Sequence, residues 1–193
     1  MDPMTNEPQV FRGIVEADLR RAARLVIKVQ DEIDPQFRIA TPEGDYWLAV
    51  TLPGEATERK AMLRRIGTFM TWKQATVFTL ASELVDPDCV YCVGVAGCER
   101  YACLSRIRRH PTPWTAASFD AVEWLPAAAI DPVIAALLPQ GPRPMTPKEV
   151  AAAEKWFGRQ GRFPAVHIAT GEVRGLGYCS LVLRAWLRTK FSG

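Results

Sequence analysis

Four of the five cysteines lie close together, in the order Cys89-x2-Cys92-x5-Cys98-x4-Cys103. A zinc site uses paired Cys-x2-Cys knuckles in turns, where the thiolates converge on one ion. This stretch contains one such pair, and no second Cys or His knuckle follows it. If residues 89–92 are extended, Cys89 and Cys92 point to opposite faces of a sheet. The spacing therefore favours reduced thiols packed as small apolar core residues, with metal binding as the alternative.

The two histidines, His110 and His167, do not belong to a recognisable catalytic motif. A Ser–His or Cys–His pair requires proximity in space, and the chain lacks the Gly-x-Ser-x-Gly sequence that presents a hydrolase serine. The acidic residues are scattered, and no second carboxylate is spaced to form an acid–base pair with Glu83. We expect Glu83 to pair with Arg106 across neighbouring strands. No catalytic residue is assigned.

Basic residues form clusters of the kind that contact phosphate groups. The candidate nucleic-acid contacts lie on a predicted helix and at the end of a predicted strand: Arg20, Arg24, Lys28, Arg106, Arg108 and Arg109. Phosphate binding requires such side chains to converge on one surface. The chain has 24 Lys and Arg against 21 Asp and Glu, and a net charge of +3 does not demand a polyanionic partner. Solvated helix faces are the other interpretation of these clusters.

A glycine-rich turn precedes the last predicted helix, in the sequence TGEVRGLG at 170–177. At a helix N-terminus such a turn exposes backbone amides that can hold a phosphate. The fragment resembles the pyrophosphate loop of the acetyl-CoA-dependent N-acetyltransferase superfamily, in which Arg/Gln-x-x-Gly-x-Gly/Ala follows a strand. Gly175 and Gly177 match the two glycines, whereas Glu172 stands at the Arg/Gln position. The resemblance covers under a tenth of the chain and implies a cofactor contact through Arg174, Gly175 and Gly177.

The elements that position these residues are predicted to surround a three-strand antiparallel meander at 76–109. Its first strand alternates, with Phe78 and Leu80 on one side and Thr79 and Glu83 on the other. Its second strand, 89–96, is apolar on both faces, which is typical of a central strand. Gly, Pro and Asp between the runs supply the turns.

Helical spacing predicts two amphipathic helices, at 16–33 and 57–70, with their apolar faces on the meander. Short strands are expected at 10–15, 37–40, 46–52 and 163–168, and a last helix at 178–190. The best local signal is a capping box, in which Thr146 caps the amide of Glu149 and Glu149 reaches back, so that a helix begins there.

Composition is that of an ordinary folded protein, with 193 residues, 48% hydrophobic and 23% charged. An odd number of cysteines and an N-terminus without an apolar run favour a soluble cytoplasmic chain without disulfides. The most apolar C-terminal stretch is too short to span a membrane. We divide the chain into an α+β core at 1–138 and a Pro-rich linker with a C-terminal helical appendage at 139–193, packed on the same domain.

The expected fold class is therefore α+β, a single domain with an antiparallel sheet of about five strands and helices packed against it. The expected function is a binding or adaptor protein with no metal or cofactor, contacting nucleic acid or a protein partner. A protein partner would need an exposed apolar patch, at Trp114, Phe119, Trp124 or the predicted helix at 178–187. The alternative is an acyl-CoA-dependent N-acetyltransferase-like enzyme that uses the turn at 171–177.

Overall fold

The centre of the sheet is formed by three consecutive antiparallel strands: β3 (Val77–Val85), β4 (Asp88–Ala96) and β5 (Glu99–Arg108). The computed structural model describes residues 7–29, 33–110, 116–138, 143–157, 165–170 and 173–174. Strand β4 lies between β3 and β5, and its apolar residues alternate toward two separate cores. The predicted meander is confirmed.

The sheet is wider than the five strands expected. A hairpin of β1 (Gln36–Thr41) and β2 (Gly44–Ala49) joins it through pairing of β1 with β3. Shorter strands extend both edges, namely β6 (Ser118–Phe119) and β7 (Glu123–Leu125) on β5, β8 (Ala165–His167) on β2, and β9 (Val173–Arg174) on β8. The order is β6-β5-β4-β3-β1-β2-β8-β9, with β7 also on β5, and every described pair is antiparallel. The fold is a single α+β domain, as expected.

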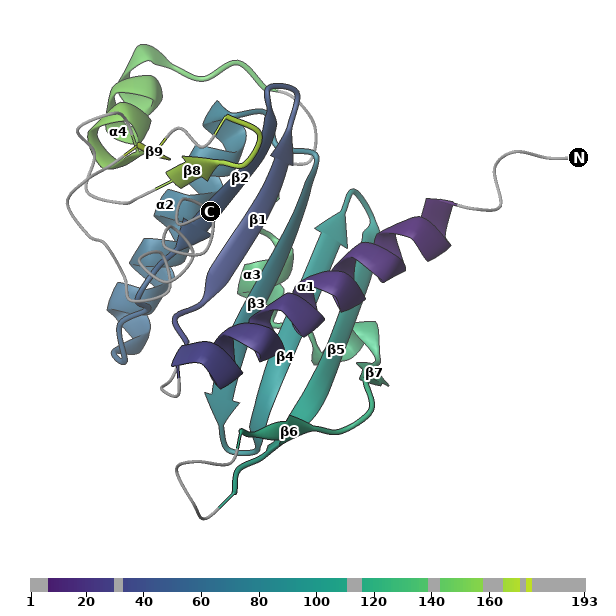
Figure 1. Ribbon diagram of the computed structural model, residues 1–193. Helices are drawn as coiled ribbons and strands as arrows, with labels where there is room; N and C mark the ends of the chain where they lie inside the picture. Colours follow the sequence, from purple (N-terminus) through teal and green to yellow (C-terminus); the bar gives the residue numbers. More distant parts are fainter. Residues whose placement is uncertain are drawn as a thin grey trace, which may run out of the picture.

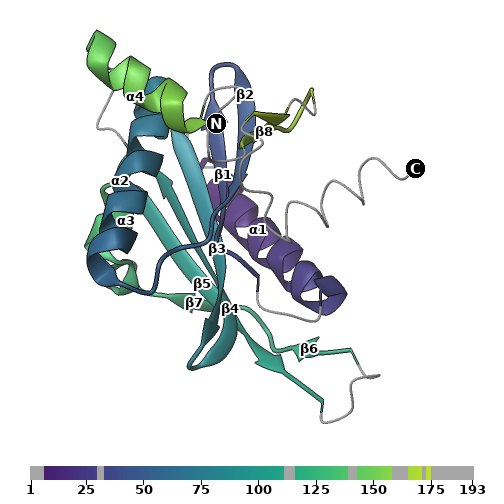
Figure 2. The ribbon, with the colours of Figure 1, turned by 90° about the vertical axis from the view of Figure 1, so that its left-hand side faces the viewer.

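Helices cover both faces of this sheet. The long helix α1 (Glu7–Val29) crosses one face and contacts β3, β4 and β5 (Figure 1). The other face carries α2 (Ala56–Trp72) and α3 (Pro132–Ala135), and α4 (Pro147–Phe157) packs on α2 (Figure 2). A short 3-10 helix, η2 (Ala127–Ala129), contacts β5. Two elements beyond residue 139 therefore attach to the core, α4 through α2 and β8 through β2.

Each face of the sheet has its own apolar core. The core under α2 is rich in aromatic rings, and Phe69 of α2 packs against Phe157 of α4 with ring centroids 4.9 Å apart. The core under α1 contains Trp47 of β2 together with smaller strand residues, including Cys92 and Cys103 under the helix. Large rings fill the space between sheet and paired helices, whereas small strand residues let the single helix α1 lie close to the backbone.

The strand predicted at 10–15 is wrong, because these residues form the first turns of α1. Phe11, Val15 and Leu19 repeat every four residues and are buried against the sheet. An apolar run of this length does not by itself separate helix from strand. The helix predicted at 16–33 therefore begins more than two turns earlier than expected.

The expected pairing of Glu83 with Arg106 is also wrong. The strand register aligns Glu83 with Val90 and Ser105, so that Arg106 lies one position away and on the opposite face of the sheet. The Glu83 carboxylate instead accepts a hydrogen bond from Arg109, which follows the end of β5. An error of one residue in the assumed alignment of β3 with β5 is therefore enough to assign Glu83 the wrong arginine.

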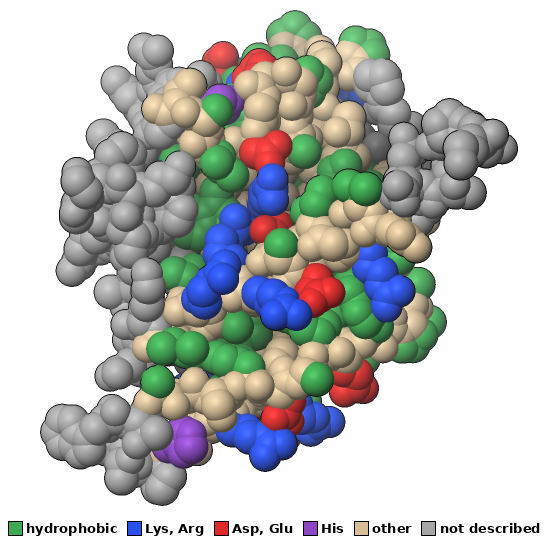
Figure 3. Space-filling view, turned by 45° about the vertical axis from the view of Figure 1, so that its right-hand side comes forward, with side chains coloured by type: hydrophobic (Ala, Val, Ile, Leu, Met, Phe, Trp, Pro, Cys, Tyr) green, Lys and Arg blue, Asp and Glu red, His purple; other side chains and the backbone are tan. Residues whose placement is uncertain are grey.

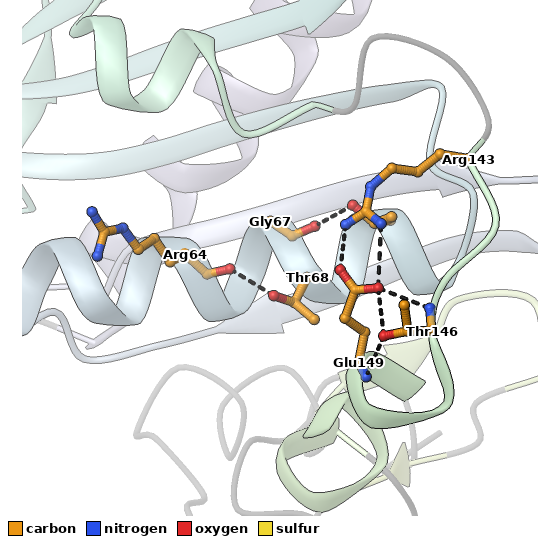
Figure 4. Close-up of polar contacts among 7 residues, drawn as sticks. Arg64, Gly67, Thr68, Arg143, Thr146 and Glu149 are labelled. Atoms are coloured by element: carbon orange, nitrogen blue, oxygen red, sulfur yellow. Dashed lines mark hydrogen bonds and ion pairs between the residues drawn. The ribbon is translucent and has the colours of Figure 1, made fainter. Parts of the chain in front are cut away.

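The capping box at the start of α4 is confirmed and is extended by a third residue (Figure 4). The Glu149 carboxylate accepts hydrogen bonds from the Thr146 N–H at 2.8 Å and its hydroxyl at 2.9 Å, and Thr146 Oγ1 accepts from the Glu149 N–H at 3.3 Å. Arg143 adds an ion pair at 2.6 Å. The hydrogen bond from Arg143, followed by those from Thr146, lowers the pKa of Glu149 from 4.5 to about 2.

We expect Glu149→Gln to lower the melting temperature at pH 6 and to have little effect near pH 2. The pKa of Glu149 is depressed in the folded chain, so its stabilisation is fully present above the ordinary value of 4.5 and is lost as the pH falls through about 2. Thermal unfolding of both forms from pH 6 to pH 2 measures this. Glu154→Gln, at an exposed position of the same helix, is the control. A Glu149→Gln effect that is unchanged at pH 2 would contradict this pH dependence.

Candidate binding groove

A groove with a volume of about 590 Å³ lies on the α1 face of the sheet. We call it the α1 groove, and its lining residues are Val10, Phe11, Ile14, Arg38, Ala40, Asp45, Val77, Thr79, Ala96, Gly97, Cys98 and Glu99. The first turns of α1 form one wall, and β1, β3 and the turn between β4 and β5 form the other. A volume of this size falls within the range of small-molecule and cofactor sites, about 300–1,000 Å³.

The width of the groove depends on how closely α1 approaches β4, and Gly94 sets that distance. An ideal Cβ built on Gly94 would lie 2.3 Å from Val15 Cγ2 and 2.9 Å from Phe11 Cζ. Any side chain at this position would therefore push the helix away from the sheet. On the groove side of this contact the strand residues that line the groove include the small Ala40 and Ala96, which leave space beneath the helix.

A charged network closes the inner end of the groove. Asp18 of α1 is 3% exposed and accepts a hydrogen bond from Thr79 Oγ1 at 2.5 Å. The same carboxylate lies 3.0 Å from Arg21 and 3.6 Å from Arg38. Arg38 also holds Asp45 at 2.6 Å. These contacts join α1 to β3, β1 and β2, and so fix the helix against the sheet.

Among the residues that line the groove there is one more carboxylate than there are cations, and the single cation is in an ion pair with one of the carboxylates. Arg38 is the cation there, and Asp45 and Glu99 are the anions. Burial acts to lower the pKa of Arg38, but hydrogen bonding to Asp45 and the charges of Asp18 and Asp45 outweigh it and raise that pKa. Arg38 therefore stays charged and paired with Asp45 and Asp18. The lining of the groove is mostly apolar and carries one net negative charge.

The turn between β1 and β2, which precedes Asp45 of β2, is held from its other side as well. Glu43 Oε2 accepts hydrogen bonds from Tyr46 Oη at 2.9 Å and from Lys73 Nζ at 2.8 Å. The Lys73 ammonium is nearly buried and lies 4.6 Å from the centroid of the Trp72 ring. These contacts tie the hairpin to the end of α2.

The His167 side chain holds the same turn by a hydrogen bond to the backbone of Glu43. Its Nε2 lies 2.8 Å from the Glu43 carbonyl oxygen, and its Nδ1 accepts the Thr170 N–H at 3.3 Å, so Nε2 carries the proton. Gly44 has φ +120°, and a Cβ there would lie 2.7 Å from His167 Nε2. The histidine is a structural anchor in this arrangement. Both sides of the hairpin are thus held, which makes the groove wall rigid.

The sequence-predicted basic residues fall into two groups, one along α1 and one at the end of β5. Three of them are in ion pairs: Arg20 with Glu16, Arg108 with Asp120, and Arg109 with Glu83 and Asp88. Arg24 and Arg106 are exposed, and the Lys28 side chain lies outside the described residues. On the face shown in Figure 3, Lys and Arg side chains alternate with acidic and hydrophobic ones. Nucleic-acid contact by these residues stays a prediction.

Of the residues that the acetyl-CoA alternative would use, only Arg174 lies among the described residues. Arg174 belongs to the two-residue strand β9, which pairs with β8. Gly175, Gly177 and the predicted helix at 178–190 lie outside the described residues. The fragment therefore remains a resemblance in sequence.

The cysteines separate by face and by exposure. Cys92 and Cys103 lie opposite each other on β4 and β5, buried under α1, and Cys89 is buried on the other face, as its spacing predicted. Burial raises the pKa of Cys103 to about 12 and the pKa of Cys92 well above its ordinary value. Cys98, by contrast, is exposed at the groove rim. In the part of the chain that the structure describes, no three His, Cys, Asp or Glu side chains are grouped to hold a metal ion.

Neither the groove nor the charged network at its inner end was predicted from the sequence. The aromatic patch expected at Phe119 and Trp124 is half-buried, with Trp124 stacked beneath Arg12 at 4.2 Å, and Trp114 lies outside the described residues. The available signal was the pair of small residues Gly94 and Ala96 on one face of a central strand, which indicates close approach of another element. That signal does not say which element approaches.

Comparisons with protein-family models, with curated proteins and with solved structures gave no match. Among the helices that the structure describes, none combines the length and the hydropathy that crossing a bilayer requires.

Proposed function

We propose that this chain is a binding protein without catalytic activity, and that the α1 groove receives the apolar part of its ligand. The observation that carries the proposal is a groove of about 590 Å³ whose walls are largely aliphatic and aromatic. Burying apolar ligand surface against Val10, Phe11 and Ile14 on one side and Val77 on the other supplies the driving force.

Rigidity of the walls supports the same proposal. The groove lies between a 23-residue helix and paired strands, and not between loops. The Asp18 network holds the helix to the strands, and Glu43 and His167 hold the hairpin that carries Asp45. A site that is already ordered loses little conformational entropy when a ligand binds. We expect binding without a large rearrangement of the sheet.

Titration of the full chain with Nile red, a neutral dye that fluoresces in apolar surroundings, tests this function. We expect saturable binding with one dye per chain. Ala40→Trp fills the groove and should weaken binding about tenfold or more, because it removes at least ~1.4 kcal/mol of apolar contact. The matched control is Val85→Trp, at a position 72% exposed at the far end of β3 and outside the groove. Non-saturable binding, or equal weakening by the two variants, would contradict the proposal.

A further inference from the structure

One carboxylate on the lining of the α1 groove has no partner among the described residues. Asp45 is held by Arg38 at 2.6 Å. Asp18, at the inner end, is held by Arg21 and Arg38, so the two carboxylates and the two guanidinium groups balance. Glu99 is half-buried, and its side chain forms neither a hydrogen bond nor an ion pair with any described residue. The net negative charge of the lining therefore belongs to Glu99.

The strand register places this carboxylate at the end of the groove that the turn between β4 and β5 forms. Glu99 pairs with Ala96 across that turn, and both residues line the groove. Successive residues of a strand point to opposite faces, so the adjacent cation Arg100 lies on the α2 side of the sheet. Arg12 of α1 is stacked on the Trp124 ring, 4.2 Å from its centroid. Neither arginine neutralises Glu99.

The rest of the groove is mostly apolar and offers no free cation to an acidic ligand. Its walls are supplied mainly by the side chains of Val10, Phe11, Ile14 and Val77. Arg38 is the one cation among the described lining residues, and it is already held by two carboxylates. A fatty acid or another anionic amphiphile would therefore meet Glu99 with no cation to compensate it. A ligand with an apolar body and a positively charged end matches both parts of the site.

We propose that the α1 groove binds a small amphiphilic cation, whose apolar body lies between α1 and the strands and whose ammonium group faces the Glu99 carboxylate. The inference rests on the proposed function, because it names the ligand class of the same groove. Glu99 determines specificity in this assignment. It selects the charge of the head group, whereas the apolar walls supply most of the affinity.

Three decyl amphiphiles with different head groups test the charge selectivity of the full-length chain. Decyltrimethylammonium is cationic, decyl glucoside is neutral and decyl sulfate is anionic, and isothermal titration calorimetry below the micelle concentration gives each affinity. We expect the cation to bind about threefold more tightly than the neutral compound, since a partly exposed ion pair contributes about that factor. The sulfate should bind least tightly. The preference for the cation should disappear between about 0.01 M and about 1 M salt, because the Debye length falls from about 30 Å to about 3 Å.

Glu99→Gln should bring the ratio of cation affinity to neutral-compound affinity to about one, because it removes the charge that selects the head group. Glu123→Gln is the matched control, since Glu123 is exposed on β7 and does not line the groove, and it should leave that ratio unchanged. Equal affinity for the three compounds would overturn the inference. So would a preference for the sulfate, which the amide groups in the first turn of α1 would favour. A cation preference that persists in Glu99→Gln would overturn it as well.

Nile red binding separates the failure of this inference from failure of the proposed function. The dye is neutral, so its binding reports on the apolar walls and not on the charge of the groove. Saturable dye binding without a preference for the decyl cation would overturn the inference alone. Absence of saturable binding by the dye and by all three decyl compounds would overturn both.

Discussion

Gly94→Ala is expected to lower the free energy of unfolding by about 2–3 kcal/mol, as measured by urea denaturation. The added methyl group would lie 2.3 Å from Val15 Cγ2, far inside van der Waals contact. Phe11 lies 2.9 Å from the same point, and both side chains come from the buried stripe of α1. Neither can move away without shifting the helix, so the strain is shared by the whole packing of α1 on the sheet.

Gly13→Ala provides a matched control for this change. Gly13 lies in α1, is exposed, and has nothing within 4 Å of an added Cβ. Alanine should there stabilise the helix by about 0.5–1 kcal/mol, since glycine is a poor helix former. The two glycine-to-alanine changes are thus expected to have opposite signs. Equal effects, or a Gly94→Ala protein as stable as the original, would mean that α1 does not lie on β4 as described.

Asp18→Ala is expected to lower the free energy of unfolding by about 2 kcal/mol. The carboxylate is buried and accepts a hydrogen bond from Thr79 Oγ1, so its loss removes the acceptor of that hydroxyl and the ion pairs with Arg21 and Arg38, of which Arg38 keeps Asp45. Breaking a fully buried ion pair costs about 3–5 kcal/mol. The Arg21 and Arg38 side chains are 31% and 32% exposed, so water relieves part of this cost.

Glu16→Ala is the control for the Asp18 prediction, because it removes a carboxylate from the same helix at the surface. The partner of Glu16 is Arg20, whose side chain is 65% exposed, and such pairs contribute about 0.5 kcal/mol or less. A double-mutant cycle of Asp18→Ala with Thr79→Val then isolates the hydrogen bond between α1 and β3. If Asp18→Ala were as mild as Glu16→Ala, the network would not be what fixes the inner end of the groove.

Those features of the fold that depend on neighbouring residues were predictable from sequence. The meander followed from side-chain alternation in β3 and from the two-sided apolar pattern of β4. The cap at Thr146 and Glu149 was predictable because both partners lie within one helical turn, and the structure added only Arg143. Signals of this kind are complete within a few residues and need no knowledge of the rest of the chain.

Features that depend on register or on packing across the sheet were not predictable. Arg109 and not Arg106 meets Glu83, because the alignment of β3, β4 and β5 is set by all three strands together. The groove requires Gly94 to meet a helix that begins more than 80 residues earlier, and the apolar pattern of that helix's first turns also fits a strand. Its polar end joins Asp18 to Thr79, which are 61 residues apart.

The most direct test of the binding groove is a ¹H–¹⁵N correlation spectrum of the full-length chain recorded with increasing Nile red. We expect the perturbed amides to be those of the first turns of α1, of β1 near Arg38 and Ala40, and of the turn at Gly97, with α2 and α4 on the opposite face unchanged. Perturbations centred on α2 and α4, or scattered over both faces without saturation, would contradict the assignment of the α1 groove as the binding site.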